Sequence, residues 1–152
     1  MSKAFYYKSS DRQTIYEVDQ VIGRLALRSG NYIIIGEGSI APTSLNAISD
    51  LNQTVECKLK AGAVEDKVKL NLWGYGLTLD IFALHVAVKF DGGIAELRCT
   101  SANPGSTSVF EISLTAIQVD ELQSGEENHP SAQHRLALYA NLQGRPIAPF
   151  RD

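Results

Sequence analysis

The chain has 152 residues, of which 44% are hydrophobic and 20% charged, and its formal net charge is −3. This length and composition are typical of a globular domain that buries a core without a metal or a disulfide, and they exclude a disordered chain. The acidic balance argues against a general nucleic-acid binder and against avid binding to anionic membranes, because both need a surplus of Lys and Arg.

The N-terminal ten residues lack the apolar core of a cleaved signal peptide. The longest apolar run, 81–88, is too short to cross a bilayer as a helix. We therefore expect no transmembrane segment and a protein that is cytoplasmic as synthesised. Export without a cleaved signal stays open.

The first part of the chain gives the weakest secondary-structure signal. Residues 1–13 are expected to be loop-like. Apolar residues recur at helical spacing between 15 and 25, but Gly23 disfavours a helix there. The pattern favours a hairpin of strands 22–28 and 32–35 around a loop at 29–31, followed by a short helix over 43–51.

The centre of the chain carries the clearest hairpin. Apolar and charged residues alternate along 55–60 and again along 67–72, on either side of Ala61-Gly62-Ala63. Such alternation predicts two antiparallel strands with one buried face and one wet face.

The stretch 77–90 is apolar at both odd and even positions. Helical spacing also fits, but its β-branched and aromatic content favours a strand that is covered on both sides, by its own chain or by another subunit. A turn at 91–93 leads to a strand over 94–101. This strand is expected to pair, across a second turn at 103–106, with a strand over 109–119. In that last strand Phe110, Ile112 and Leu114 are expected to face inward, and a bulge is expected near 116–117.

The last part is ambiguous. Residues 120–131 read as an acidic loop, and 132–147 fits either a helix or a hairpin. The whole pattern predicts one mainly β domain over 1–152, an antiparallel β-sandwich or flattened barrel of about seven to nine strands with at most one or two short helices.

The two cysteines, Cys57 and Cys99, lie in strand-like segments and form no CxxC pair. Two buried thiols are the favoured interpretation, and a single disulfide is the alternative.

Three groups of residues resemble functional sites. Gly36-Glu37-Gly38-Ser39-Ile40-Ala41 has the letters of a dinucleotide fingerprint, but no βαβ pattern follows it, so we predict a glycine-bent strand end and no nucleotide cofactor. His129 and His134 stand near Glu126 and Glu127 without the geometry of a metal site, and no metal is predicted.

Asp80 and His85 interrupt the apolar stretch 77–90 and could perform acid–base chemistry in a water-poor site. As strand residues five apart they would face opposite sides of the sheet, which favours a strand-end Asp and a hydrogen-bonded core or interface His. No hydrolase, P-loop or zinc-protease motif is present, so no catalytic residue is assigned and an enzyme is not the favoured class.

The wet face of the central hairpin is the predicted binding site. Continuing the alternation places four lysines and two aromatic residues on one face, and aromatic residues of this kind are enriched at binding hot spots. The alternative is a solvated lysine face with the tryptophan turned into the core. The predicted site comprises Lys58, Lys60, Lys67, Lys69, Trp73 and Tyr75.

The leading hypothesis is a non-catalytic binding or assembly module that recognises a protein partner, itself, or an acidic or saccharide ligand through this aromatic-basic face. A second hypothesis is a carrier of a small apolar ligand or lipid, or an enzyme using Asp80 or His85, with a pocket lined by Phe82, Leu84 and Val86. A third is a subunit of a larger toxin or secretion assembly.

Overall fold

The computed structural model describes residues 2–43, 54–72 and 79–125. The chain divides into two compact units, 1–122 and 123–152. Only 123–125 of the second unit are described, so a single domain over the whole chain stays a prediction. In the described ranges no helix is long and apolar enough to span a membrane.

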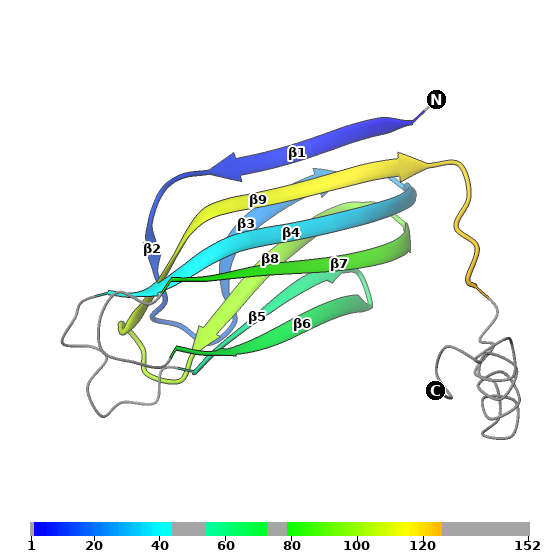
Figure 1. Cartoon of the computed structure of the whole chain (residues 1–152). Helices are drawn as coiled ribbons and strands as arrows, with labels where there is room; N and C mark the ends of the chain where they lie inside the picture. The colour runs from blue at the N-terminus through cyan, green and yellow to red at the C-terminus, as the bar shows by residue number, and fades with distance from the viewer. Residues whose placement is uncertain (1, 44–53, 73–78, 126–152) are drawn as a thin grey trace, which may run out of the picture. The chain divides into compact units, whose positions relative to one another are not determined.

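The regular elements of the described ranges are nine β-strands, all in the first unit (Figure 1). They are β1 (Lys3–Ser9), β2 (Gln13–Thr14), β3 (Gln20–Leu27), β4 (Gly30–Pro42), β5 (Thr54–Ala61), β6 (Val64–Asn71), β7 (Asp80–Phe90), β8 (Gly93–Ser101) and β9 (Thr107–Val119).

The strands form two antiparallel sheets. Sheet A has the order β1-β9-β4-β7, with β2 also paired to β9, and sheet B has the order β3-β8-β5-β6. The predicted antiparallel β-sandwich is confirmed, and because neighbours in each sheet are mostly distant in sequence it is of the jelly-roll kind. Figure 1 shows the two layers of strands.

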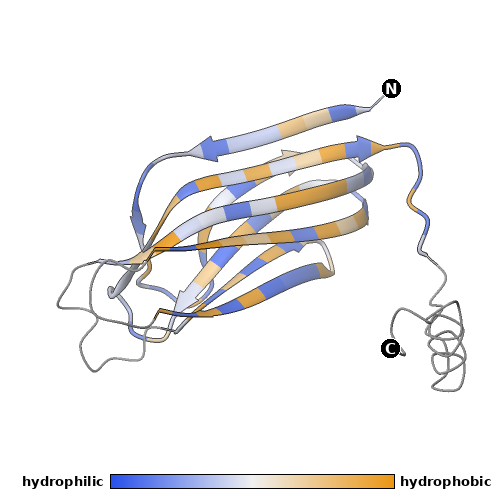
Figure 2. Ribbon diagram, in the orientation of Figure 1, coloured by the Kyte–Doolittle hydropathy of each residue, from blue (hydrophilic) through white to orange (hydrophobic). Residues whose placement is uncertain are grey.

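Alternation along the strands builds the core between the sheets, as the hydropathy bands in Figure 2 illustrate. In β7 every second residue from Phe82 to Phe90 is buried, and the residues between them are exposed. In β5 the buried set is Val55, Cys57, Leu59 and Ala61. Phe82, Leu84 and Val86 belong to this one buried cluster, and a ligand pocket lined by them stays a prediction.

Only one of the predicted hairpins is a hairpin. β5 and β6 pair from Thr54 opposite Asn71 to Ala61 opposite Val64. By contrast, β3 and β4 lie in different sheets, as do β7 and β8, and β8 and β9. The predictions that 22–28 pairs with 32–35 and that 94–101 pairs with 109–119 are therefore wrong, because a turn within one sheet and a crossing between two sheets use the same Gly, Asn and Pro residues.

Three further expectations change. Residues 1–13 are not loop-like, because β1 and β2 both pair with β9. The irregularity of β9 lies at Glu111, whose φ is +51°, and not near 116–117. The bulge reverses the parity, so Ile112 and Leu114 are buried as expected but Phe110 lies opposite Ser39 on the outer side. Residues 44–51 and 132–147 lie outside the described residues.

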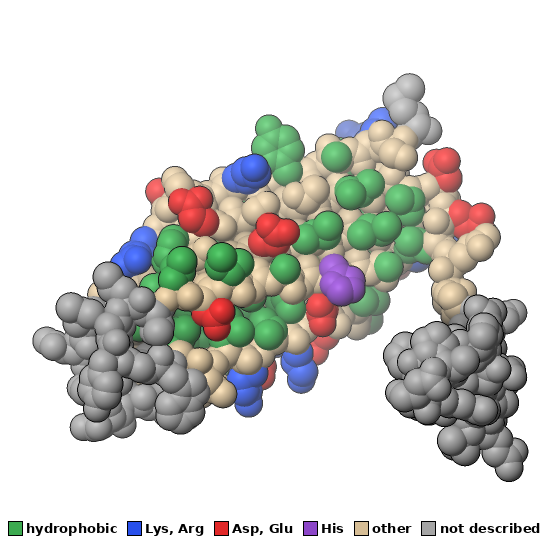
Figure 3. All heavy atoms as spheres, in the orientation of Figure 1, with side chains coloured by type: hydrophobic (Ala, Val, Ile, Leu, Met, Phe, Trp, Pro, Cys, Tyr) green, Lys and Arg blue, Asp and Glu red, His purple; other side chains and the backbone are tan. Residues whose placement is uncertain are grey.

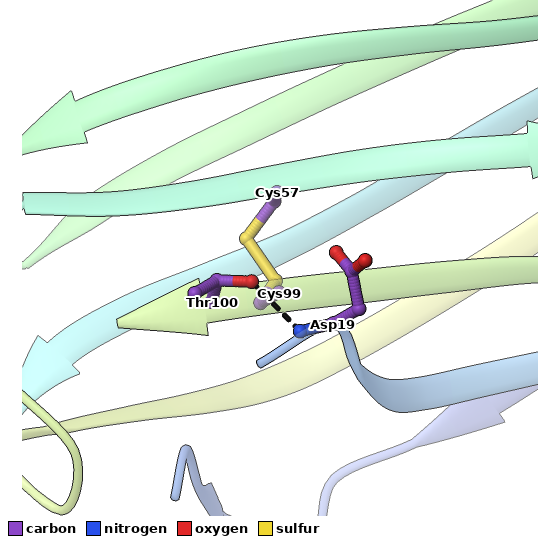
Figure 4. The surroundings of a disulfide bond; sticks show 4 residues. All are labelled: Asp19, Cys57, Cys99 and Thr100. Carbon is purple, nitrogen blue, oxygen red and sulfur yellow. Dashed lines mark hydrogen bonds between the residues drawn. A yellow bond between two sulfur atoms is a disulfide. The ribbon is translucent and has the colours of Figure 1, made fainter. Parts of the chain in front are cut away.

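The two cysteines are bonded to each other, which corrects the favoured interpretation of free thiols (Figure 4). Cys57 and Cys99 face each other in register on the neighbouring strands β5 and β8, and both are buried. The sequence could not reveal this pair, because its members are 42 positions apart and nothing in the sequence shows that β5 and β8 are adjacent.

Candidate functional site

The four lysines of the predicted site lie on the outer face of sheet B. Their neighbours along β5 and β6 that face inward are buried or half-buried, and the lysines themselves are exposed or half-buried. Lys58 lies directly opposite Lys67. Trp73 and Tyr75 lie outside the described residues.

Acidic side chains share this outer face with the lysines. Glu56 lies opposite Lys69, and Lys60 lies between Glu65 on β6 and Glu96 on β8. Opposite charges in directly facing positions attract one another across neighbouring strands. The parity of Glu56 and Glu65 is visible in the sequence and already places them beside the lysines.

The remaining row of the face is entirely basic. Arg98, Lys58 and Lys67 lie side by side on β8, β5 and β6. An acid from just before β3 compensates it in part, because the Asp19 carboxylate lies 3.0 Å from the Lys58 ammonium. Arg98 is also paired with Glu96 on its own strand.

Asp19 is held in this position by its backbone. It has a left-handed φ of +52°, and its amide donates a hydrogen bond of 2.8 Å to the Thr100 hydroxyl (Figure 4). The hydrogen bond from Lys58 lowers the pKa of the Asp19 carboxyl below its usual value, against a smaller opposing effect of desolvation. Sequence reasoning missed Asp19, because no alternation links a residue in a turn to a strand 39 positions away.

The outer face of sheet A is different in character, and Figure 3 shows apolar side chains gathered over it. Ile33 and Ile35 of β4 point outward between buried neighbours, and Ile117 of β9 lies in register with Ile33 on the same face. On the edge strand β7, Ile81 is 69% exposed. The consecutive isoleucines 33–35 signal this second apolar face in the sequence.

Three rows of side chains cross this face, one residue from each of the four long strands. The first row is apolar, the second is mixed, and the third contains two charges. From β1 through β9 and β4 to β7 the rows are Ala4, Ile117, Ile33 and Ala87; Tyr6, Thr115, Ile35 and His85; and Lys8, Ser113, Glu37 and Ala83.

The charged row borders a hollow of about 480 Å³. Lys8, Glu37, Glu111 and Ser113 line it together with Ser9, Ser10 and Ile112. Among the described residues, neither Lys8 nor Glu37 forms an ion pair. The hollow therefore holds one ammonium and two carboxylates that are available to a partner.

Asp80 and His85 do not form a catalytic pair. They lie on β7 with opposite parity, as predicted for a strand, and His85 is exposed on the outer face of sheet A. It is the purple side chain in Figure 3, because it is the only histidine within the described ranges. His85 is therefore not a core residue, and the other expected role, an interface histidine, stays a prediction.

The six residues with fingerprint letters lie within β4 and open no helix. Gly38 faces inward, where an added Cβ would lie 2.8 Å from the Phe82 ring. Because glycine has no side chain, the Phe82 ring can pack at this position, so Gly38 has a packing role. His129, His134, Glu126 and Glu127 lie outside the described residues, and within those residues no group of three or more metal-ligating side chains occurs.

Comparisons with known proteins show the fold and no family. No family model matches the chain, and no curated protein does. VP2 of infectious bursal disease virus aligns with a TM-score of 0.50 at 11% identity, over 77% of this chain and 32% of that chain. The Eiger TNF of S. frugiperda aligns at 0.45 with 9% identity, over 83% and 98%. The globular domain of zebrafish complement 1qA aligns at 0.45 with 7% identity, over 79% and 98%.

Proposed function

We propose that this domain is a non-catalytic assembly module that associates with further copies of itself through the outer face of sheet A. The observation that carries the proposal is the apolar row of Ile117, Ile33 and Ala87 across β9, β4 and β7, with Ile35 in the next row. Ile33, which is 37% exposed, stands in the middle of this row, and Ile81 lies on β7 beyond the charged row. Soluble monomers rarely expose contiguous apolar surface of this kind, and such surfaces mark interaction sites.

The β7 edge of sheet A is a less suitable contact than the face of the sheet. β7 is one of its two edge strands, and an unprotected edge invites pairing with another strand. The Asp66 carboxylate reaches from β6 and accepts a hydrogen bond of 3.1 Å from the backbone amide of His85. Because this acid occupies an amide that a docking strand would need, association through the face is favoured over association through the β7 edge.

Substitution of one central isoleucine tests the proposal. Light scattering should give the wild-type protein a mass that is a multiple of the chain's 16.6 kDa. Ile33→Lys should lower this mass to that of one chain, because burying an ammonium in an apolar contact costs about 3 kcal/mol. The matched control is Ile94→Lys, since Ile94 is an exposed isoleucine of β8 in sheet B.

Circular dichroism should report the same strand content for both variants. A wild-type protein that stays monomeric at about 100 µM, well above a micromolar dissociation constant, would contradict the proposal. So would an equal loss of association in both variants.

A second proposal concerns the outer face of sheet B. We propose that Lys58, Lys60, Lys67 and Lys69, with Trp73 and Tyr75, bind an acidic or saccharide ligand. The supporting observation is the basic row described above, in which Lys67 has no ion pair among the described residues.

Heparin, an acidic polysaccharide, is the probe for this second surface. Lys67→Glu and the double variant Trp73→Ala/Tyr75→Ala should each elute from a heparin column at lower salt than the wild type, with unchanged melting temperatures. Lys89→Glu, on β7 of sheet A, is the control for net charge. Equal elution of Lys67→Glu and Lys89→Glu would show that only net charge matters.

A further inference from the structure

Two opposite charges on the outer face of sheet A flank β9 on either side. Lys8 on β1 and Glu37 on β4 both face Ser113 of β9, one from each side. Neighbouring strands are about 4.8 Å apart, so the ammonium-bearing and carboxylate-bearing residues stand at equal distances from the central strand. β9 itself contributes only uncharged side chains, Ser113, Thr115 and Ile117, to the three rows.

This symmetry matches one particular way of stacking two copies. A two-fold axis that runs along β9 in the plane of contact keeps each row at its level and exchanges the two sides of the sheet. The side chain of Lys8 then lies over Glu37 of the second copy, and the reverse contact follows from the symmetry. The same operation places Ile117 against its own equivalent and Ala4 against the second copy's Ile33.

We infer that two copies of the chain form a face-to-face dimer about β9, held in register by two reciprocal Lys8–Glu37 ion pairs. The inference rests on the proposed self-association and adds its geometry. Two sheets that pack face to face lie about 10 Å apart, with their strands within about 30° of each other. The hollow beside Glu37 and Glu111 gives the incoming Lys8 side chain room to reach a carboxylate.

Charge complementarity favours a second copy over an unrelated partner as the occupant. The face presents an ammonium and a carboxylate that have no ion pair in the described part of their own chain. Each finds its counterpart at the corresponding place of an identical face. A partner of different sequence would need no such symmetry.

Charge reversal and recombination test the register. Lys8→Glu and Glu37→Lys should each raise the dimer dissociation constant, measured by sedimentation, by roughly 10- to 100-fold, because each creates two like-charge contacts. The double variant Lys8→Glu/Glu37→Lys should return to within about threefold of the wild type. Lys3→Glu is the control for net charge, since Lys3 is an exposed lysine of the same strand that lies opposite Gln118 and has the opposite parity to Lys8.

Mixing the two single variants gives the sharpest result. In a mixed dimer the new acid at position 8 faces the new lysine at position 37, and the two original side chains face each other. The mixture should therefore dimerise more tightly than either variant alone, with a mass of two chains.

Each failure has its own meaning. A monomeric wild type overturns both the dimer and the proposed self-association. A wild type that associates but is insensitive to Lys8→Glu and Glu37→Lys overturns the register and leaves the apolar contact standing. A mass of three chains overturns the two-fold arrangement, because a ring has no two-fold contact.

Discussion

The disulfide gives the sharpest prediction about stability. Cys57 and Cys99 join two strands in the middle of sheet B, and the chain between them includes β6, β7 and most of β8. Reduction should leave the folded packing nearly unchanged, because both sulfurs are buried and already face each other in register. The main effect falls on the unfolded chain, which gains freedom.

The size of the effect follows from the length of the loop. A bridge between residues 42 positions apart removes a loop-closure entropy that corresponds to about 4 kcal/mol at 25 °C in the chain-entropy model. Domains of this kind are stable by about 5–15 kcal/mol, so the loss is a large fraction of the total. The slope of unfolding against urea should also rise, since an unbridged chain exposes more surface.

The measurement compares the same protein with and without reductant in urea, at one protein concentration. The reduced form should unfold with a free energy lower by about 3–4 kcal/mol. Cys57→Ala/Cys99→Ala is the control: it should be at least as unstable as the reduced form and indifferent to reductant. Two titratable thiols in the denatured, untreated protein, with a difference under about 1 kcal/mol, would refute the bridge and restore the free-thiol interpretation.

The remaining predictions concern packing and pH. Gly38→Ala should lower the free energy of unfolding, measured in urea, by about 1–3 kcal/mol, because the new Cβ would lie 2.8 Å from the Phe82 ring. Gly125→Ala is the control and should change this free energy little, since no atom lies within 4 Å of the position of its Cβ. Equal effects of the two substitutions would contradict the packing role of Gly38. Because the pKa of Asp19 is lowered, its pairing with Lys58 stabilises the fold at pH values above the ordinary carboxyl pKa of 3.8. This stabilisation is lost as the pH falls through the lowered pKa. Wild-type stability should therefore fall more steeply below about pH 4 than that of Asp19→Asn, and parallel curves would contradict the pairing.

Alternation predicted the side of the sheet on which a residue lies, and it did so well. The inward set of β7 and the outward lysines of β5 and β6 follow from a two-residue period alone. Alternation carries no information about which strands are neighbours in space. For this reason the pairing of β5 with β8, the disulfide and the position of Asp19 beside Lys58 could not be predicted.

The parity argument also depends on an unbroken strand. Glu111 adds one residue to β9, and everything before it changes sides, which is why Phe110 lies outward. Nothing in the sequence marks Glu111 as a residue of left-handed conformation, since glutamate rarely adopts one. We expected the bulge at 116–117 because of the apolar residues there. The pairing of β9 with β4 is instead regular from Ser113 to Val119.

The two outer faces differ in how their charges are compensated, and this difference bears on function more than the charges themselves do. On sheet B, Lys58 is paired with Asp19, and Lys60 lies between Glu65 and Glu96 on the neighbouring strands, so acids of the chain itself already neighbour these two lysines. On sheet A, Lys8 and Glu37 have no ion pair with any residue that the structure describes, and they lie at the border of an apolar surface. Association there removes apolar area from water and supplies the missing counter-charges in the same step, whereas a ligand on sheet B must first compete with acids of the chain.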